Sequence, residues 1–408
     1  MTQRYDTYKD SGVQWLGEIP GHWGCVFINR LFNIKAGGDV KPELYADKKD
    51  ENHPFPVYTN TKSADDVYAY TSLATCPSNS ITVTGRGEVG HAIFRETPYD
   101  AIVRLLSLTP KSNIICKFYA YFIDTVIPFS SDSAAIGQLS AVQIKQKHVT
   151  LPPLSEQRSI VSFLDAKCGK IDEWVTKKQK EVEHLQELKQ RVIADAVTRG
   201  LNPHVKMKAT NIPWIKEIPE HWDMSKISSH FRQRNEKVSD KDYPALSVSK
   251  QGVTPQLDNV ALSNAEGTSR KLVKVGDYAV NSRSDRKGSC GVSKYEGSVS
   301  LITIVLEPFN IDGEYVHYLF RSNPWVEEFY RNGRGIVADL WTTNYQMMKS
   351  MYMPVPPLSE QRSIVSYLDV KCSKIDKLIA NITKEIDCIK EYKQRLISDV
   401  VTGQIKVC

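Results

Sequence analysis

Long apolar runs, paired cysteines and a secretion signal are all missing from this sequence. No apolar run reaches the roughly 20 residues needed to cross a bilayer. The first residues, MTQRYDTYKDSG, lack the basic and then apolar pattern of a secretory signal. The eight cysteines form no CxxC pair and have no histidine cluster beside them. We therefore expect a cytoplasmic protein with reduced thiols, no metal site and no membrane contact.

The short motifs of common enzymes are missing as well. The sequence has no Walker A loop, no HExxH, no GxSxG and no NPPY-like methyltransferase motif. The segment 85–90, GRGEVG, matches the dinucleotide pattern GxGxxG, but the residues after it, HAIFR, are typical of a strand. A nucleotide phosphate requires a helix at that point. We therefore predict a β-turn here and no catalysis by this chain.

Charge of one sign is not in clear excess. The net charge of the 408 residues is +6. Residues 1–150 carry 15 basic and 15 acidic side chains, and residues 204–353 carry 20 and 17. This balance does not by itself indicate a nucleic-acid partner. Any such inference must come from the organisation of the chain.

An internal repeat organises the chain. Residues 152–168 read PPLSEQRSIVSFLDAKC, and residues 356–372 read PPLSEQRSIVSYLDVKC, so 15 of 17 letters agree at an offset of 204. The pattern W-x-x-E-I-P-x-H-W opens each half, at Trp15–Trp23 and at Trp214–Trp222. Identical residues in both halves favour a shared structural role, so we predict that these tryptophans and histidines pack rather than stack on bases or catalyse. The regions between the openings and the helices differ.

Each PPLSEQR phrase predicts the start of a long helix. In the first copy Pro153 ends what precedes it, Ser155 can cap, and Glu156 suits the positive end of the helix dipole. The apolar residues then follow a heptad in one register in both copies, which indicates a coiled coil. The predicted seam consists of Ile171, Val175, Val182, Leu185, Val192, Ile375, Ile379, Ile382, Ile386, Ile389 and Leu396. Cys168 and Cys372 should be core residues.

The repeat predicts an α+β protein with a pseudo-two-fold axis. We expect a first mixed, β-rich domain at 1–150, a spacer helix with its linker at 151–203, a second β-rich domain at 204–353 and a C-terminal spacer helix at 354–408. Strands are predicted at 80–84, 92–94, 278–280 and 300–306, and short helices at 117–124 and 314–322. The two long helices should pair antiparallel, and a parallel pairing remains the alternative.

Basic and small polar side chains gather at two pairs of places. One pair is the GRGEVG turn and the segment 286–291; the other is the segment 55–62 and the segment 243–250. Such side chains suit phosphates and base edges, although a solvated surface turn has the same composition. The candidate DNA-binding residues are Tyr58, Asn60, Lys62, Arg86, Ser247, Ser249, Lys250, Arg283, Arg286 and Lys287.

The doubled PPLSEQR phrase with its helix, together with the IP-x-H-W openings, resembles the specificity (S) subunit of type I restriction-modification enzymes. The resemblance covers essentially the whole chain, and the GRGEVG turn is similar to a turn of that family. It implies two target-recognition domains, each of which reads half of an asymmetric, split double-stranded DNA sequence, with the coiled coil setting the spacing.

The same resemblance implies the partners. Two methyltransferase subunits with S-adenosylmethionine and ATP-dependent, Mg-requiring restriction subunits would join this non-catalytic chain, which would itself hold no cofactor. Phe163, Trp174, Tyr367 and Leu378 are candidate contacts for the methyltransferases, unless they widen the intrachain seam. The alternative function is a scaffold that spaces two ligand-binding domains without DNA specificity, and the balanced charge of residues 1–150 favours it.

Overall fold

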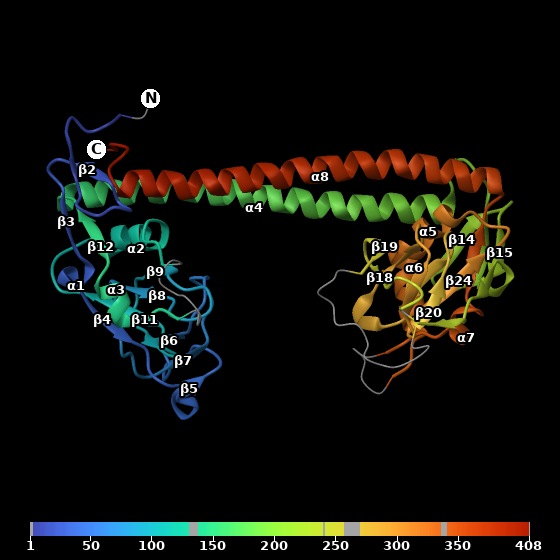
Figure 1. Ribbon diagram of the computed structural model, residues 1–408, viewed down its shortest axis with the longest axis horizontal. Helices are drawn as coiled ribbons and strands as arrows, with labels where there is room; N and C mark the ends of the chain where they lie inside the picture. Colours follow the sequence, from blue (N-terminus) through green and yellow to red (C-terminus); the bar gives the residue numbers. More distant parts are fainter. Residues whose placement is uncertain (1–2, 130–137, 240, 257–269, 336–340, 408) are drawn as a thin grey trace. The chain divides into compact units, whose positions relative to one another are not determined.

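The chain divides into two compact units. Unit 1 comprises residues 1–178 and 384–408, and unit 2 comprises residues 179–383. Figure 1 shows the computed structural model, which describes residues 3–129, 138–239, 241–256, 270–335 and 341–407. Each unit contains one β-rich domain and a part of both long helices.

A four-stranded antiparallel sheet lies at the centre of each domain, with its strands in the same order. In unit 1 the order is β4 (Phe32–Ala36), β11 (Leu106–Pro110), β8 (Ser80–Val83) and β9 (Ala92–Arg95). In unit 2 the order is β16 (Phe231–Gln233), β24 (Thr303–Pro308), β21 (Tyr278–Asn281) and β22 (Cys290–Val292). The duplication seen in the helices therefore extends into the regions whose sequences differ.

The predicted strand at 300–306 is wrong in its bounds. The strand β23 (Gly297–Ser300) ends where the prediction begins, and β24 starts only at Thr303. Leu301 and Ile302 form the turn between the two strands and are 42% and 43% exposed. The prediction treated these two apolar residues as the start of a buried strand, although they lie in the turn. The predictions at 80–84, 92–94 and 278–280 are confirmed by β8, β9 and β21.

Smaller sheets surround the central ones, and two of them are also duplicated. The opening motifs lie in two-stranded antiparallel sheets, and a second pair of strands precedes each long helix. These pairs are β1 (Tyr8–Asp10) with β2 (Glu18–Pro20), β13 (Met207–Ile212) with β14 (Ile215–Pro219), β3 (Gly24–Phe27) with β12 (His148–Leu151), and β15 (Asp223–Lys226) with β25 (Tyr352–Val355).

The remaining strands form sheets that differ between the units. Unit 1 has the order β10 (Asp100–Ala101), β6 (Phe55–Tyr58), β7 (Ala69–Thr71) and β5 (Tyr45–Ala46). Unit 2 has β17 (Lys237–Val238), β20 (Arg270–Val273) and β23 in one sheet and the hairpin β18 (Leu246–Ser249) with β19 (Gly252–Pro255). The domains thus share a central sheet and diverge in their smaller sheets.

One short helix packs on the end of each central sheet. The helix α2 (Cys116–Thr125) contacts β8 and β9, and α5 (Gly313–Arg321) contacts β22, which confirms both helix predictions. The other short helices are α1 (Ile28–Leu31), η1 (Pro42–Leu44), α3 (Ala141–Lys145), η2 (Ile227–Ser229), η3 (Ser284–Arg286), α6 (Asn323–Arg331) and α7 (Tyr345–Met348). The buried faces of α2 and α5 join the main core of their own unit.

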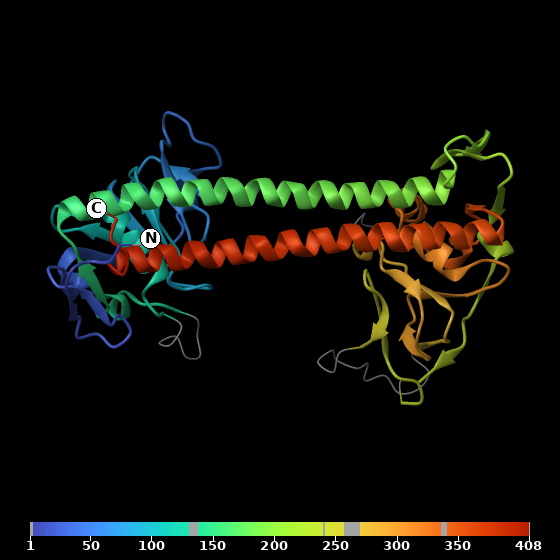
Figure 2. The same ribbon diagram turned by 90° about the horizontal axis from the view of Figure 1, so that it is seen from above.

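The long helices are α4 (Leu154–Arg199) and α8 (Leu358–Val401), close to their predicted extents. In unit 1 the first part of α4 lies along the last part of α8, and in unit 2 the last part of α4 lies along the first part of α8 (Figures 1 and 2). The pairing is antiparallel, as predicted. The seam side chains are buried or half-buried: Ile171, Val175, Ile386, Ile389 and Leu396 in unit 1, and Val182, Leu185, Val192, Ile375, Ile379 and Ile382 in unit 2.

One lysine of each long helix, Lys189 of α4 and Lys393 of α8, forms an ion pair with the opposite helix. In unit 1 the Lys393 ammonium is 2.7 Å from the Asp172 carboxylate. In unit 2 the Lys189 ammonium is 2.7 Å from the Asp376 carboxylate. Lysine and aspartate are repeat equivalents, so the same pair forms once in each unit. Half-exposed pairs of this kind contribute only about 0–1 kcal/mol, but the positions they occupy define one antiparallel register.

The glutamate of each LSEQR phrase binds the opening motif of its own domain. Glu156 accepts hydrogen bonds from Tyr5 Oη at 2.8 Å, Trp23 Nε1 at 3.0 Å and His22 Nε2 at 2.6 Å. Burial raises the pKa of Glu156, but these hydrogen bonds outweigh it and lower that pKa below its usual value. The equivalent residue of unit 2 has the same role. Glu360 accepts hydrogen bonds from Trp222 Nε1 at 3.0 Å and His221 Nε2 at 2.8 Å.

The neighbouring glutamine fixes the short helix of the domain. In unit 1 the Gln157 side chain accepts from the Ile115 amide at 3.0 Å, at the start of α2, and donates to the Pro152 carbonyl at 2.8 Å. Gln361 makes the same two bonds in unit 2, to the Asp312 amide and the Pro356 carbonyl, each at 2.8 Å. Both glutamines are 1% exposed. The repeated phrase is thus a joint between long helix and domain, and Cys168 and Cys372, buried beside it, are core residues as predicted.

No helix among the described residues is long and apolar enough to cross a membrane. In the same part of the chain, no group of three or more His, Cys, Asp or Glu residues is placed to hold a metal ion.

The joint predicts a contrast between two adjacent residues of α8. Gln361→Ala should lower the free energy of unfolding by about 1–3 kcal/mol, because a buried amide and a buried carbonyl lose their partners. Arg362→Ala should change it by less than about 0.5 kcal/mol, because Arg362 is exposed. Urea denaturation of both variants measures the difference. Equal effects would contradict the role of Gln361.

Candidate nucleic-acid interface

The GRGEVG segment of unit 1 is a tight turn between β8 and β9. Gly87 and Gly90 have φ values of +69° and +91°, which glycine adopts without strain. A Cβ on Gly85 would lie 2.7 Å from the Arg104 carbonyl oxygen. A strand and not a helix follows the turn, so no helix N-terminus is available for a nucleotide phosphate. The predicted β-turn is confirmed.

Asn60 holds this turn in place. Its side-chain oxygen accepts from the amides of Gly85 at 2.7 Å and Arg86 at 3.2 Å. Its side-chain nitrogen donates to the Val103 carbonyl at 2.8 Å. Asn60 was a candidate for base contact, but in the structure its hydrogen-bonding groups are engaged within the domain. It positions the backbone that presents Arg86.

The Arg86 side chain projects from the turn into solvent. It is exposed, and no hydrogen bond or ion pair engages its guanidinium among the residues that the structure describes. The neighbouring candidate Lys62 is also exposed and pairs with Glu88, at the far side of the same turn. Arg86 is therefore a cation without a charged partner among the described residues, and it is free to meet a phosphate.

The side chains of Tyr58 and His91 are engaged within the domain. Tyr58 is 9% exposed and has the Arg95 guanidinium 3.5 Å from its ring centre, so this candidate is not presented for DNA contact. His91 bridges Asp124, 2.5 Å from Nδ1, and the Lys62 carbonyl, 2.8 Å from Nε2. The hydrogen bond to Asp124 raises the pKa of His91 and outweighs its burial. The contact between His91 and the Lys62 carbonyl ties the segment that carries Lys62 to the domain.

Arg283 occupies the place of Arg86 in unit 2. Arg86 forms an isolated antiparallel bridge with Gln138, and Arg283 forms one with Thr342. Both arginines follow equivalent strands, β8 and β21. Pairing the GRGEVG turn with the segment 286–291 by its glycines was therefore wrong. The two arginines are equivalent because of the strands that precede them, and the glycine pattern of the turns does not show this.

The other candidate cations of unit 2 have partners within the domain. Arg283 makes two contacts with the Asp285 carboxylate, at 3.0 and 3.1 Å, and Arg286 lies 3.7 Å from the same carboxylate. Lys287 lies 3.1 Å from Glu327. The carboxylates of these pairs therefore offset the charge of the candidate cations. All of them are exposed or half-exposed, so a competing phosphate can replace the carboxylates at low cost.

The candidates of the segment 243–250 lie on a hairpin. Ser247 and Ser249 are half-buried on β18, and Lys250 is exposed at the turn to β19. The segments 55–62 and 243–250 each have a neighbour that runs parallel to them. In unit 1 β10 pairs with β6, and in unit 2 Ser298 forms an isolated parallel bridge with Ala245. The two segments therefore occupy comparable places in their domains.

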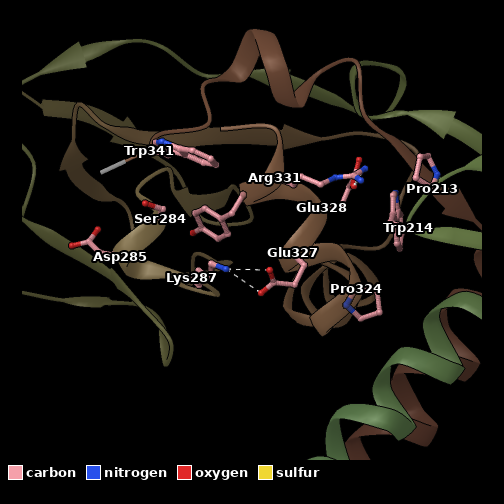
Figure 3. A pocket seen from close by; sticks show the side chains of 11 residues that line it. Pro213, Trp214, Ser284, Asp285, Lys287, Pro324, Glu327, Glu328, Arg331 and Trp341 are labelled. Carbon is pink, nitrogen blue, oxygen red and sulfur yellow. Dashed lines mark hydrogen bonds and ion pairs between the residues drawn. The ribbon is translucent and has the colours of Figure 1, made fainter. Parts of the chain in front are cut away.

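A hollow of about 730 Å³ lies beside the Arg283 turn (Figure 3). Its lining includes Trp214, Tyr330 and Trp341, and Lys287 and Glu327 form an ion pair across part of it. Trp214 packs edge-on against Trp325, with ring centres 5.5 Å apart. Trp214, predicted to pack, is half-buried at this rim, whereas Trp23 and Trp222 are fully buried.

An exposed face on each long helix repeats between the units. In unit 2 the face includes Arg362, Ser366, Tyr367 and Lys371 around an open groove of about 580 Å³. At the offset of 204, unit 1 carries Arg158, Ser162, Phe163 and Lys167. Of the predicted partner contacts, Tyr367 and Leu378 are 38% and 51% exposed, and Phe163 and Trp174 are half-buried.

Sequence reasoning missed two residues of this surface, Gln138 and Thr342. Gln138 faces Arg86, and Thr342 lies between Arg283 and Arg334. Neither residue belongs to a motif that indicates DNA contact. The signal that identifies them is the pairing of segments more than 50 residues apart, which only the fold reveals.

Comparisons with known proteins identify the family. Residues 20–184 match the model of the type I restriction modification DNA specificity domain. A putative type I specificity subunit of Mycoplasma pneumoniae is 30% identical over 143 residues, which cover 33% of this chain and 39% of that protein. The type I restriction enzyme MjaVIII specificity subunit of Methanocaldococcus jannaschii is 21% identical over 420 residues, which cover 95% of this chain and 94% of that protein.

The chain spans only 39% of the length of two Mycoplasma pneumoniae relatives that it matches. A solved structure from work on complex assembly and conformational transition of the type I R-M system has the same fold. Its TM-score is 0.68 at 13% identity, with 94% of this chain and 98% of that chain covered. Residues 20–184 thus belong to the family of type I restriction modification DNA specificity domains, and the chain is similar over nearly its whole length to a type I specificity subunit.

Proposed function

We propose that this chain recognises an asymmetric, two-part DNA sequence for a type I restriction-modification complex. The observation that carries the proposal is the arginine turn. Two domains with the same central sheet, inside a DNA-specificity family, each present an arginine at the same place. The surfaces around the two arginines differ in sequence, so each domain is suited to a different half-site. A homodimer, with identical surfaces, would read a symmetric target.

The chemistry of methylation and cleavage belongs to other subunits in this proposal. Methyltransferase subunits would hold S-adenosylmethionine, and restriction subunits would use ATP and Mg. This chain would contribute the choice of sequence, through phosphate contacts that position each domain and base contacts that discriminate. A good bidentate base contact discriminates by ~1–3 kcal/mol. Two domains on one chain multiply this discrimination, since the second binding event is intramolecular.

The arginine turns predict a graded salt response. Arg86→Ala should weaken binding of the assembled complex to all DNA sequences and lower the slope of log affinity against log salt by about 1. Arg283→Ala should act in the same way. Lys206→Ala, at an exposed lysine just before β13 in unit 2, is the matched control. Filter binding at several salt concentrations measures the slopes. A flat slope for the wild-type complex would instead favour the DNA-independent scaffold.

The repeated helix faces support two methyltransferase subunits per chain. Arg158 and Arg362 are exposed and occupy the same position in the two units. In unit 2 Arg362 and the aromatic residue Tyr367 line the same groove. Arginine and aromatic side chains are enriched at protein interfaces. Because the faces are equivalent, each should carry one copy of the same partner. The restriction subunits would join through this assembly.

These faces predict a change in stoichiometry. Arg158→Ala or Arg362→Ala alone should leave one methyltransferase subunit bound per chain, and the double variant should leave none at concentrations where the wild type binds two. Lys180→Ala, at an exposed position elsewhere on α4, is the control. Native mass spectrometry counts the subunits. Two retained copies in the double variant would contradict the assignment of these faces.

A further inference from the structure

Each turn arginine lies directly opposite a residue from a distant part of the chain. In unit 1 the Leu139 amide donates to the Gly85 carbonyl at 2.9 Å and sets Gln138 against Arg86. In unit 2 the Ser284 amide donates to the Trp341 carbonyl at 2.8 Å, and the Thr343 amide donates to the Ser282 carbonyl at 3.0 Å. These bonds set Thr342 against Arg283.

Both bridges bring the facing side chains close together. The amides and carbonyls of the neighbouring residues bond to each other, so each bridge is the non-hydrogen-bonded type of antiparallel pair. In such a pair the Cα atoms are about 4.5 Å apart and the two side chains leave the same face. Gln138 therefore projects beside Arg86, and Thr342 beside Arg283.

The two facing residues hold the same place in the duplicated fold. Gln138 lies two residues before Ser140, the N-cap of α3. Thr342 lies two residues before Asn344, the N-cap of α7. The Ser140 cap is reciprocal: its hydroxyl accepts from the Gln143 amide, and the Gln143 side chain accepts from the Ser140 amide. A capped helix on one side and a strand bridge on the other fix the backbone of each residue.

The side chains of Gln138 and Thr342 are free to bond outward. Gln138 is half-buried and Thr342 is exposed, and neither side chain bonds to any residue that the structure describes. Asn60, by contrast, uses its amide within the domain. Thr342 is also hydrogen-bonded through its backbone to Arg334, at 3.1 Å in both directions, so the exposed Arg334 lies on its other side.

The constant and the variable member of each pair suit different tasks. The arginine is the same in both units, and a phosphate backbone is the same at every base pair. The facing residue is glutamine in one unit and threonine in the other. Glutamine can bond bidentately to the N6 and N7 of adenine, and threonine can bond to a base edge while its methyl group contacts the thymine methyl group.

We propose that Gln138 and Thr342 are specificity-determining residues, each of which reads a base edge in one half-site beside an arginine that contacts phosphate. Gln138 would read an adenine in the half-site of unit 1. Thr342 would read one base of the half-site of unit 2. This inference rests on the proposed function and assigns its sequence selectivity to named residues.

The test is a methylation map of the native host with single substitutions in its own gene. Gln138→Ala should relax one position of one half-site so that several bases are accepted, and leave the other half-site unchanged. Purified mutant complex should bind the original site roughly 5- to 150-fold more weakly, with an unaltered salt slope. Gln146→Ala, an exposed glutamine of the same unit, should change neither the map nor the affinity. Arg86→Ala should weaken binding to all sequences alike.

Two outcomes would overturn the inference. One is an unchanged recognition motif in Gln138→Ala; the other is a uniform loss of affinity with a lowered slope, as for Arg86→Ala. If Gln138→Ala does not accumulate, Thr342→Val, which keeps the shape and removes the hydroxyl, poses the same question in the other half-site. A wild-type map with no motif that depends on this chain would refute the proposed function itself. A normal wild-type map with an unaffected variant would refute only the role of Gln138.

Discussion

The first turn of each long helix carries the constraint on which both units depend. A glutamate there accepts hydrogen bonds from the histidine and the tryptophan of the opening motif, and the next residue, a buried glutamine, holds the start of a short helix. Buried polar groups are costly unless they are paired, so this joint tolerates few changes. It ties the domain to the helix from two directions. The domains can diverge elsewhere because their attachment is fixed here.

Divergence is concentrated where the fold permits it. The central sheets have one strand order in both units, whereas the outer sheets differ in number and pairing of strands. The turn arginine lies at the end of the constant sheet, and the residue that faces it comes from the variable surface. A constant scaffold thus presents a constant cation beside a changeable side chain. This arrangement suits a protein that must bind any DNA backbone and select one sequence.

The repeat, the long helices and their seam could be predicted because these signals are local and periodic. Ser155 and Glu156 mark a helix start, and the heptad after them has one register in both copies. The strands β8 and β21 were also evident, but the start of β24 was not, because Leu301 and Ile302 are apolar residues of a turn. Asn60 was identified as a polar loop residue, and only the structure shows that it supports the Arg86 turn.

Gln138 and Thr342 could not be identified from the sequence because their position beside the turn arginines depends on non-local strand pairing. Arg86 and Gln138 are 52 positions apart, and Arg283 and Thr342 are 59 apart. For the same reason the sequence alone does not match Arg86 with Arg283. Aligning the two turns by their glycines pairs the segment 85–90 with the segment 286–291, which lies after Arg283.

The central claim is that this chain decides which DNA sequence its complex modifies. Mapping methylated bases across the host genome by long-read sequencing, with and without the gene for this chain, tests it most directly. The account predicts that deletion removes one motif, made of two different short parts separated by unspecified bases, and that reintroduction restores it. A methylation map that is the same with and without the gene would contradict the account.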